Sequence, residues 1–205
     1  MDAQEPSLRE QKKALARAKT LDVAHKLFRE KGFEQTTLEE ICSEASISKR
    51  TFFRYFRDKE SLIFPNRESR LEAFRMFLQA YGDAENPFEV LRLATEVFSR
   101  EYNHNFDKIL AQQTLIQSSP SLRAREAEID RDWEIEIAAA FARRSGPGRQ
   151  NELWAAVAAG AVMGVVRATM RQWFAHGCRE DLNALGQMAI DSLERGFPER
   201  FVPGA

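Results

Sequence analysis

Apolar residues recur at helical spacing through most of this chain, and the alternation typical of strands is absent. Between residues 9 and 31 the apolar positions fall on one side of a helix, which predicts a helix with one buried face. These positions are Leu15, Leu21, Ala24, Leu27 and Phe28. Gly32 follows and can end the helix, because glycine readily adopts the left-handed conformation of a C-cap.

Two short helices are predicted next, joined by a tight turn. Thr37 followed by Glu40 fits the capping-box pattern, so the second helix is expected to begin near Leu38. It is expected to end near Ala45, and Ser48 can cap the third helix.

The remaining residues predict longer helices separated by proline, glycine and serine. Asp58 can cap a fourth helix that runs to about Tyr81, and Pro65 within it predicts a kink or a broken first turn. Further helices are predicted at about 87–102, 106–117, 121–144, 151–176 and 181–195. We therefore expect an all-α chain with nine helices and no strands. A three-helix domain over residues 1–60 would precede a larger helical domain over residues 61–205.

Positive charge is concentrated in the predicted third helix. Residues 1–60 carry a net charge of +2 and the remainder −3, a difference too small to be informative. Locally, however, no acidic residue occurs from Ala45 to Arg57. In that stretch basic residues alternate with aromatic ones, namely Lys49, Arg50, Phe52, Phe53, Arg54, Tyr55, Phe56 and Arg57. A helix that is apolar on one side and basic on the other is suited to lie against DNA.

The same window meets the requirements of a helix-turn-helix. Ala45 is small enough for a close helix contact, and Ile47 can anchor the turn by packing in the core. The start of the next helix, Ser48 to Thr51, can then face the major groove, where Lys and Arg reach guanine edges or phosphates. A solvated basic face is the alternative interpretation. Because caps, turn, helix contact and charge agree within residues 36–59, we favour the DNA-binding interpretation.

The segment LFREKGFEQTTLEEICSEASISKRTFFRYFRDKESL, residues 27–62, resembles the N-terminal domain of the TetR family of bacterial transcriptional regulators. The matching positions are Phe28, Gly32, Phe33, Thr36, Thr37, Ile41, Ala45, Ser48, Lys49, Thr51, Tyr55, Phe56, Lys59 and Glu60. The resemblance implies phosphate contacts by Thr37, Ser48, Thr51 and Tyr55, base contacts near Lys49 and Arg50, and a phosphate anchor at Lys59. The full set of predicted DNA-binding residues is Thr36, Thr37, Ser48, Lys49, Arg50, Thr51, Phe53, Arg54, Tyr55 and Lys59.

Three positions depart from the family pattern. Ser46 stands where the family often has Gly, and a positive φ there would cost about 1 kcal/mol. Arg50 replaces a small residue and Phe53 replaces a Tyr, so the operator of a relative cannot be transferred to this chain. Residues 9–19 carry five basic side chains, which fit either a solvated helix end or an arm on adjacent DNA.

The segment 100–200 resembles regulators of the mycofactocin-associated type. The resemblance rests on an aromatic-rich helix, FARRSG, an Ala/Gly-rich helix ending in WFAHG, and the following DL…L…GF. Members of that group are associated with acyl-coenzyme A ligands. The resemblance implies a small apolar or amphipathic effector, which an acyl-coenzyme A would satisfy.

The predicted helix ELWAAVAAGAVMGVVRATMRQWF, residues 152–174, is apolar on more than one side. This pattern indicates burial on most sides. One side can pack inside the monomer and another against a second copy, whereas the alternative is a central core helix of a monomer. In the TetR family the last two helices form a four-helix dimer interface. A two-fold dimer also fits a pseudo-palindromic double-stranded DNA operator, whose half-sites lie about 34 Å apart.

Aromatic and methionine residues of the second domain are candidates for an effector pocket, because such side chains line adaptable apolar cavities. The ligand-binding candidates are Phe106, Leu110, Trp133, Phe141, Met163, Arg167, Met170 and Trp173, and Leu115 is a further one. For each apolar candidate an ordinary core position is the simpler interpretation. Arg167 or Arg171 can meet an acidic group of the ligand, and a salt bridge in the dimer interface is the simpler interpretation.

Other chemistry is not indicated. The chain is 43% hydrophobic and 30% charged, as in ordinary soluble proteins. Two cysteines and three scattered histidines make neither a disulfide framework nor a zinc site. We expect no cofactor, no metal and no enzymatic activity. Glu39, Glu40 and Glu44 are interpreted as capping and solvated charges. The N-terminus has no secretory signal and no apolar run suggests a membrane span, so a cytoplasmic location is expected.

We therefore hypothesise a homodimeric, DNA-binding transcriptional repressor that an apolar or amphipathic effector releases from its operator. Two alternatives within the regulator class are an activator and a regulator that answers to no small molecule. A further alternative is an all-helical interaction protein that does not bind DNA, and an enzyme with an apolar substrate is more distant.

Overall fold

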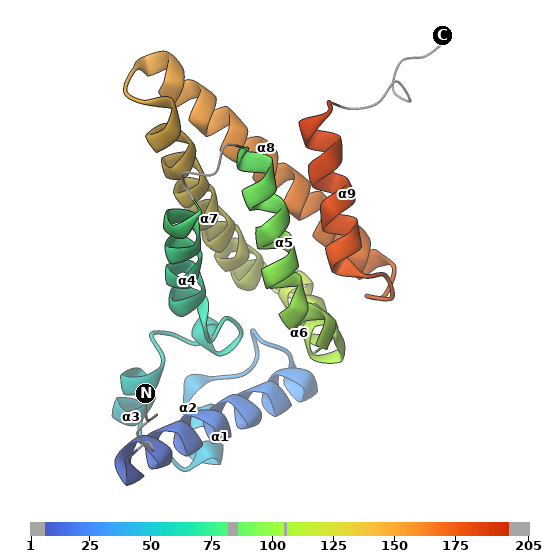
Figure 1. Cartoon of the computed structure of the whole chain (residues 1–205). Coiled ribbons are helices and arrows are strands. Elements are labelled where there is room, and N and C mark those ends of the chain that lie inside the picture. Colours follow the sequence, from blue (N-terminus) through green and yellow to red (C-terminus); the bar gives the residue numbers. More distant parts are fainter. Residues whose placement is uncertain (1–6, 82–85, 105, 197–205) are drawn as a thin grey trace. The chain divides into compact units, whose positions relative to one another are not determined.

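The computed structural model describes residues 7–81, 86–104 and 106–196 (Figure 1). Within these residues the chain forms nine α-helices and one short 3₁₀ turn, with no strand, which confirms the all-α expectation. The helices are α1 (Leu8–Lys31), α2 (Leu38–Ala45), α3 (Lys49–Tyr55), α4 (Arg67–Ala80), α5 (Pro87–His104), α6 (Phe106–Ser118), α7 (Pro120–Ser145), α8 (Arg149–Ala175) and α9 (Leu182–Glu194); the 3₁₀ turn is η1 (Glu60–Leu62).

The helices belong to two units. The first extends to Arg67 and also takes in Leu115–Arg125, the turn between α6 and α7 with its flanking residues. The second consists of Glu68–Thr114 together with the chain from Glu126 onwards. The boundary thus lies beyond the residue 60 expected from the sequence. A segment from the middle of the chain joins the first unit because Ile116 and Leu122 are buried in its core.

One face of α1 supplies much of the core of the first unit. Ala24, Leu27 and Phe28 are buried and pack with Phe33 and with residues of the following helices. Leu15, expected on the same buried face, is instead 77% exposed. The apolar stripe of α1 therefore begins later in the helix than the sequence pattern suggests.

The predicted fourth helix is broken at its start. Asp58 does not cap an α-helix: only the 3₁₀ turn η1 follows it, with Lys59 at the N-cap position, and Asp58 Oδ1 accepts a hydrogen bond from Ser61 N at 2.8 Å. The α-helix itself begins at Arg67, two residues after Pro65. Proline lacks a backbone N–H and its ring clashes with the preceding turn. Of the two outcomes expected from the sequence, a kink and a broken first turn, the structure therefore shows the broken first turn.

In the second unit, α9 packs closely on α5 and α8, which lie beside it in Figure 1. One close approach is at Gly186, where an added Cβ atom would come within 2.2 Å of Thr95 Cγ2. Polar contacts support the same pair of helices. Arg92 on α5 donates to Asp191 at 2.7 Å and pairs with Glu194, both on α9. The fit of α5 to α9 therefore depends on a glycine beside an ion-pair network.

The apolar character of α8 is only partly accounted for by this packing. Ala155, Ala159 and Val162 are buried, but Leu153 and Trp154 are each 63% exposed. An 18-residue window of α8 has a mean hydropathy of 1.6 and is 22% buried, so by length and composition alone the helix could cross a membrane. The sequence analysis expected no apolar run that suggests a membrane span, and for α8 this expectation was wrong. Core helices of soluble proteins pass the same test, so the observation by itself does not indicate a membrane.

Replacing Gly186 by Ala is expected to lower the free energy of unfolding by about 1–3 kcal/mol, because the new methyl group overpacks the contact with Thr95. Urea denaturation followed by circular dichroism measures the change. Gly160→Ala in α8 is the matched control, since its Cβ would meet only Glu134 Oε1 at an ordinary 3.7 Å. Adding Thr95→Ser, which removes Cγ2, should restore stability to the Gly186→Ala variant. Equal stability of the two alanine variants would contradict the packing described here.

Candidate nucleic-acid interface

A capping box begins α2, as the sequence predicts. Glu40 N donates to Thr37 Oγ1 at 3.2 Å, and Thr37 N donates to Glu40 Oε2 at 2.9 Å. Lys31 of α1 donates to the same carboxylate at 2.6 Å. The ion pair with Lys31 and the bonds from Thr37 lower the pKa of Glu40 to about 2. The start of α2 is thus tied both to its own cap and to the end of α1.

The turn between α2 and α3 has the expected geometry. Ser46 adopts a left-handed conformation with φ of 59° and ψ of 44°, which confirms the positive φ considered from the sequence. Such a conformation costs a residue with a Cβ atom about 1–2 kcal/mol. Ala45 is buried, and Ile47 packs against the core while its N–H donates to Cys42 O at 2.9 Å. Ala45 at the helix contact and Ile47 in the turn therefore lie where a helix-turn-helix requires a small residue and a buried apolar one.

The third helix buries its aromatic side and exposes its basic side. Phe52 is completely buried and Phe56, just beyond the helix, is nearly so. Lys49 and Arg50 are exposed, and Phe53 is 55% exposed. We name the exposed side of α3, comprising Lys49, Arg50, Phe53 and Arg54, the basic face.

The hydroxyls predicted to contact phosphates also serve as caps. Ser48 Oγ accepts from Thr51 N at 3.1 Å and lies 3.0 Å from Thr51 Oγ1. Ser48 and Thr37 are exposed and Thr51 is half-buried, so a lone pair or proton on each can still meet a ligand. Tyr55 is half-buried, and Arg54 lies over its ring and donates to its hydroxyl at 2.9 Å.

Two of the predicted contacts have internal partners. Thr36 is completely buried, and its hydroxyl donates to Gly32 O at 2.8 Å, so its side chain holds the α1–α2 loop and is not presented to a ligand. The Lys59 ammonium donates to Phe33 O at 2.9 Å and to Thr36 O at 3.0 Å. It also lies 4.2 Å from the centroid of the Phe33 ring. With two of its three donors used, Lys59 has a structural role that the sequence did not reveal.

The α6–α7 turn reinforces this unit in a way that local sequence patterns do not predict. Ser119 Oγ donates to Glu34 Oε1 at 2.5 Å, and this bond lowers the pKa of Glu34. Arg125 donates to Asp58 Oδ2 at 2.6 Å. Leu122, at the start of α7, is buried in the core of the same unit. The α6–α7 turn and the first residues of α7 therefore bind the loop before α2 and the loop after α3.

The predicted effector-binding residues do not form one group. Trp133, Phe141 and Met163 belong to a cluster with Phe74, whose ring centroid is 4.4 Å from that of Trp133. A second cluster contains Leu110, Met170 and Trp173, and Phe106 lies apart, 46% exposed. Leu115 packs in the core of the first unit, so its assignment to an effector pocket was wrong.

The charged candidate Arg167 faces acidic side chains of α7. It lies 3.9 Å from Asp130 and 3.8 Å from Glu134. Burial raises the pKa of Asp130, and burial together with the charge of Asp130 raises the pKa of Glu126. Arg167 thus forms a salt bridge within the chain, and the interface salt bridge considered from the sequence stays a prediction.

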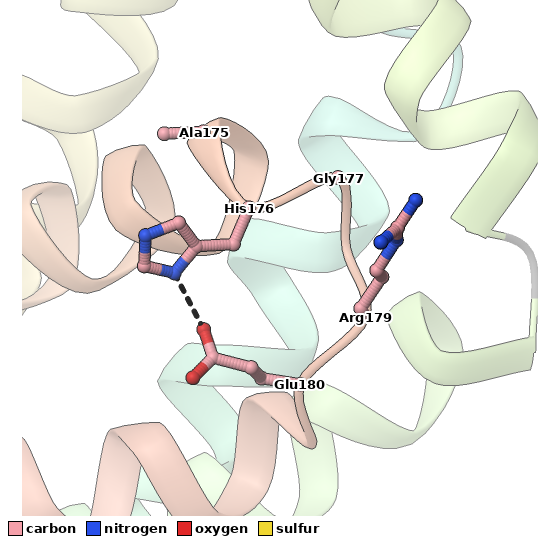
Figure 2. Close-up of a pocket in the computed structure, with 5 residues that line it drawn as sticks. All are labelled: Ala175, His176, Gly177, Arg179 and Glu180. Atoms are coloured by element: carbon pink, nitrogen blue, oxygen red, sulfur yellow. Dashed lines mark hydrogen bonds and ion pairs between the residues drawn. The ribbon is translucent and has the colours of Figure 1, made fainter.

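A shallow hollow lies at the turn between α8 and α9 (Figure 2). It is lined by Ala175, His176, Gly177, Arg179 and Glu180, and His176 Nδ1 is 2.8 Å from Glu180 Oε2. The hollow is open to solvent, and none of the predicted effector-binding residues lines it. It also has no large aliphatic side chain of the kind expected in a site for an amphipathic ligand.

Comparison with known sequence families agrees with the geometry of the helix-turn-helix. The family described as bacterial regulatory proteins, tetR family, matches residues 21–64. The family described as the MftR C-terminal domain matches residues 85–198, more than half of the chain.

Individual relatives match over nearly the whole chain. The HTH-type transcriptional regulator TcmR of Streptomyces glaucescens is 28% identical over 213 residues, covering 98% of this chain and 92% of TcmR. The putative mycofactocin biosynthesis transcriptional regulator MftR of Mycobacterium tuberculosis is 26% identical over 176 residues, covering 86% and 88%. These relatives are regulators and not enzymes.

Solved structures show the same fold. The fatty acid degradation regulator FadR from Bacillus halodurans superposes with a TM-score of 0.61 at 19% identity, covering 89% of this chain and 96% of that one. FadR from Bacillus subtilis in complex with stearoyl-CoA gives a TM-score of 0.57 at 18% identity, covering 86% and 96%. With a TetR-type helix-turn-helix followed by an MftR-type domain, the chain belongs to the tetR family of bacterial transcriptional regulators.

Proposed function

We propose that this regulator is a homodimeric repressor, released from a pseudo-palindromic operator by an apolar or amphipathic effector. The observation that carries the proposal is the basic face of α3, presented beside a correctly capped turn. The domain of residues 1–60 reads DNA, and that of residues 61–205 binds the effector and dimerises. The protein acts in the cytoplasm, where bacterial DNA lies.

Reading of the operator is proposed for the basic face. Lys49 and Arg50 are exposed at the start of α3 and contact base edges, where their donors match guanine acceptors. Thr37, Ser48, Thr51 and Tyr55 position the helix through phosphates. Thr36 and Lys59 act indirectly, because their polar groups hold the loop on which Thr37 is placed.

Dimerisation is proposed for α8 and α9. Leu153, Trp154 and Val157 lie on one side of α8 at helical spacing, and Gly164 on the same side allows a close helix approach. Met188 on α9 is 61% exposed. Contiguous exposed apolar residues of this kind mark an interaction surface, and a second copy of the same two helices would cover it in a four-helix arrangement. A two-fold dimer supplies the two α3 helices that a pseudo-palindrome requires.

An effector of acyl-coenzyme A type is proposed from the MftR-type domain and from FadR, a fold neighbour determined with stearoyl-CoA. The apolar clusters around Trp133 and Trp173 are the regions that can accept an acyl chain. The effector releases DNA by population shift, which requires that it bind the non-operator-binding state more tightly.

Replacing both Lys49 and Arg50 by Ala is expected to weaken binding to the DNA upstream of the regulator's own gene by about a hundredfold or more, since each residue loses a base contact. A gel shift or fluorescence anisotropy titration measures the loss. The control, Lys108→Ala with Arg131→Ala, removes the same charge from exposed sites of the second unit. Retained sequence-specific binding by the first variant would refute the role of the basic face.

Replacing Leu153 by Glu is expected to convert the dimer to monomer, because the buried carboxylate would have no partner in the interface. Sedimentation equilibrium measures the mass. Ile135→Glu is the matched control, since Ile135 on α7 is 57% exposed in the single chain and lies outside the proposed interface. A wild-type monomer, or an unchanged dimer for Leu153→Glu, would exclude this interface.

Saturating stearoyl-CoA is expected to raise the melting temperature and to dissociate the DNA complex, whereas coenzyme A alone should do neither. At a hundredfold excess over Kd the stabilisation amounts to about 2.7 kcal/mol. Differential scanning fluorimetry and anisotropy measure the two effects. If no acyl-coenzyme A or other apolar compound in a panel shifts either signal, the effector proposal fails while DNA binding stands.

A further inference from the structure

The three glutamates of α2 expected to be capping or solvated charges have different partners. Glu40 caps its own helix and pairs with Lys31 of α1. Glu44 lies 4.0 Å from Lys26, also on α1. Glu39 alone pairs with the third helix, where its carboxylate accepts from the Lys49 ammonium. The pair joins the first turn of α2 to the first residue of the basic face.

The Glu39–Lys49 pair contributes little to folding stability. The two side chains are 62% and 54% exposed, and ion pairs at such sites are worth about 0–1 kcal/mol. The contact is nevertheless direct, since the Lys49 ammonium donates a hydrogen bond to Glu39 Oε1, and this bond lowers the pKa of Glu39. An exposed pair that does little for the fold but engages a base-reading lysine points to a role in recognition.

We propose that Glu39 is a specificity-determining residue. Its carboxylate holds the Lys49 ammonium away from DNA phosphates but leaves two of its three N–H donors available to a base. An ammonium has three donors. One is directed at Glu39, and the other two can still reach guanine O6 and N7. The carboxylate also offsets the charge of Lys49, which lowers its attraction to any phosphate backbone. Binding to arbitrary DNA is thereby weakened more than binding to the operator.

The inference rests on the proposed role of Lys49, and Glu39→Gln tests it. The probes are a duplex selected from a random pool by the wild-type protein and a scrambled duplex of equal length. For the variant, affinity for scrambled DNA is expected to rise about three- to fivefold, as for loss of an exposed ion pair. Its salt dependence should steepen by about 0.9 in log–log slope, the value for one additional phosphate contact. Affinity for the selected duplex should change by less than about twofold, so the specificity ratio falls.

Glu44→Gln is the matched control, because it removes the same charge from the same helix but pairs with α1. Equal effects of Glu39→Gln and Glu44→Gln on scrambled DNA would overturn the inference in favour of net charge alone. A double-mutant cycle with Lys49→Gln identifies the group on which Glu39 acts. In that background Glu39→Gln should no longer raise affinity for scrambled DNA, and an undiminished effect would equally overturn the inference. If the wild-type protein selects no duplex and binds none at low salt, the proposed DNA reading fails instead.

Discussion

The burial of Phe52 and Phe56 is the interaction on which the basic face depends. The third helix has seven residues, far fewer than the roughly 12–15 that a helix needs to persist alone in water. Its two buried rings lie 5.2 Å apart in the core that also contains Phe28 and Phe33. Burial of each such ring contributes about 1.5–3 kcal/mol. Because these rings occupy one side of the helix, the charged residues are left on the other.

Polar contacts then set the direction in which the short helix points. Ser46 adopts a left-handed backbone conformation that is unfavourable for a residue with a Cβ atom, and the turn made in this way directs Ile47 into the core. Lys59 binds two carbonyls of the loop before α2. Arg125, from the α6–α7 turn, binds Asp58 just after α3. The fold thus holds the helix-turn-helix from both ends, and one of these supports comes from the middle of the chain.

Local features of the fold could be predicted from the sequence because their causes are local. The capping box at Thr37, the left-handed Ser46 and the break at Pro65 each depend on residues within one turn of the chain. The interactions that were missed involve partners distant in sequence. Neither the bonds of Lys59 to Phe33 O and Thr36 O nor the contact of the α6–α7 turn with Glu34 leaves a periodic pattern.

The candidate sites show the same division. Lys49 and Arg50 were predicted to face DNA because they stand at the start of a helix that has basic and aromatic residues and no acidic one, and both side chains are exposed in the structure. The effector residues were chosen by side-chain type alone, which does not distinguish a cavity wall from a packed core. Similarly, the sequence could not separate Glu39 from Glu44, because both are exposed acids of α2 and only the position of α3 gives them different partners.

The path of the chain suggests how an effector signal can reach the basic face. The backbone passes between the two units at residues 67–68, 114–115 and 125–126, so α4, α6 and α7 each link them covalently. In the second unit the aromatic side chains around Trp133 pack on one another, with Phe74 and Phe98 from α4 and α5. An acyl chain entering there must separate rings on α4 and α7, the helices that continue into the first unit. For the proposed effector, the apparent affinity would equal the intrinsic affinity multiplied by the fraction of molecules in which the rings are already separated. The free energy of separating them would then couple effector binding to DNA release.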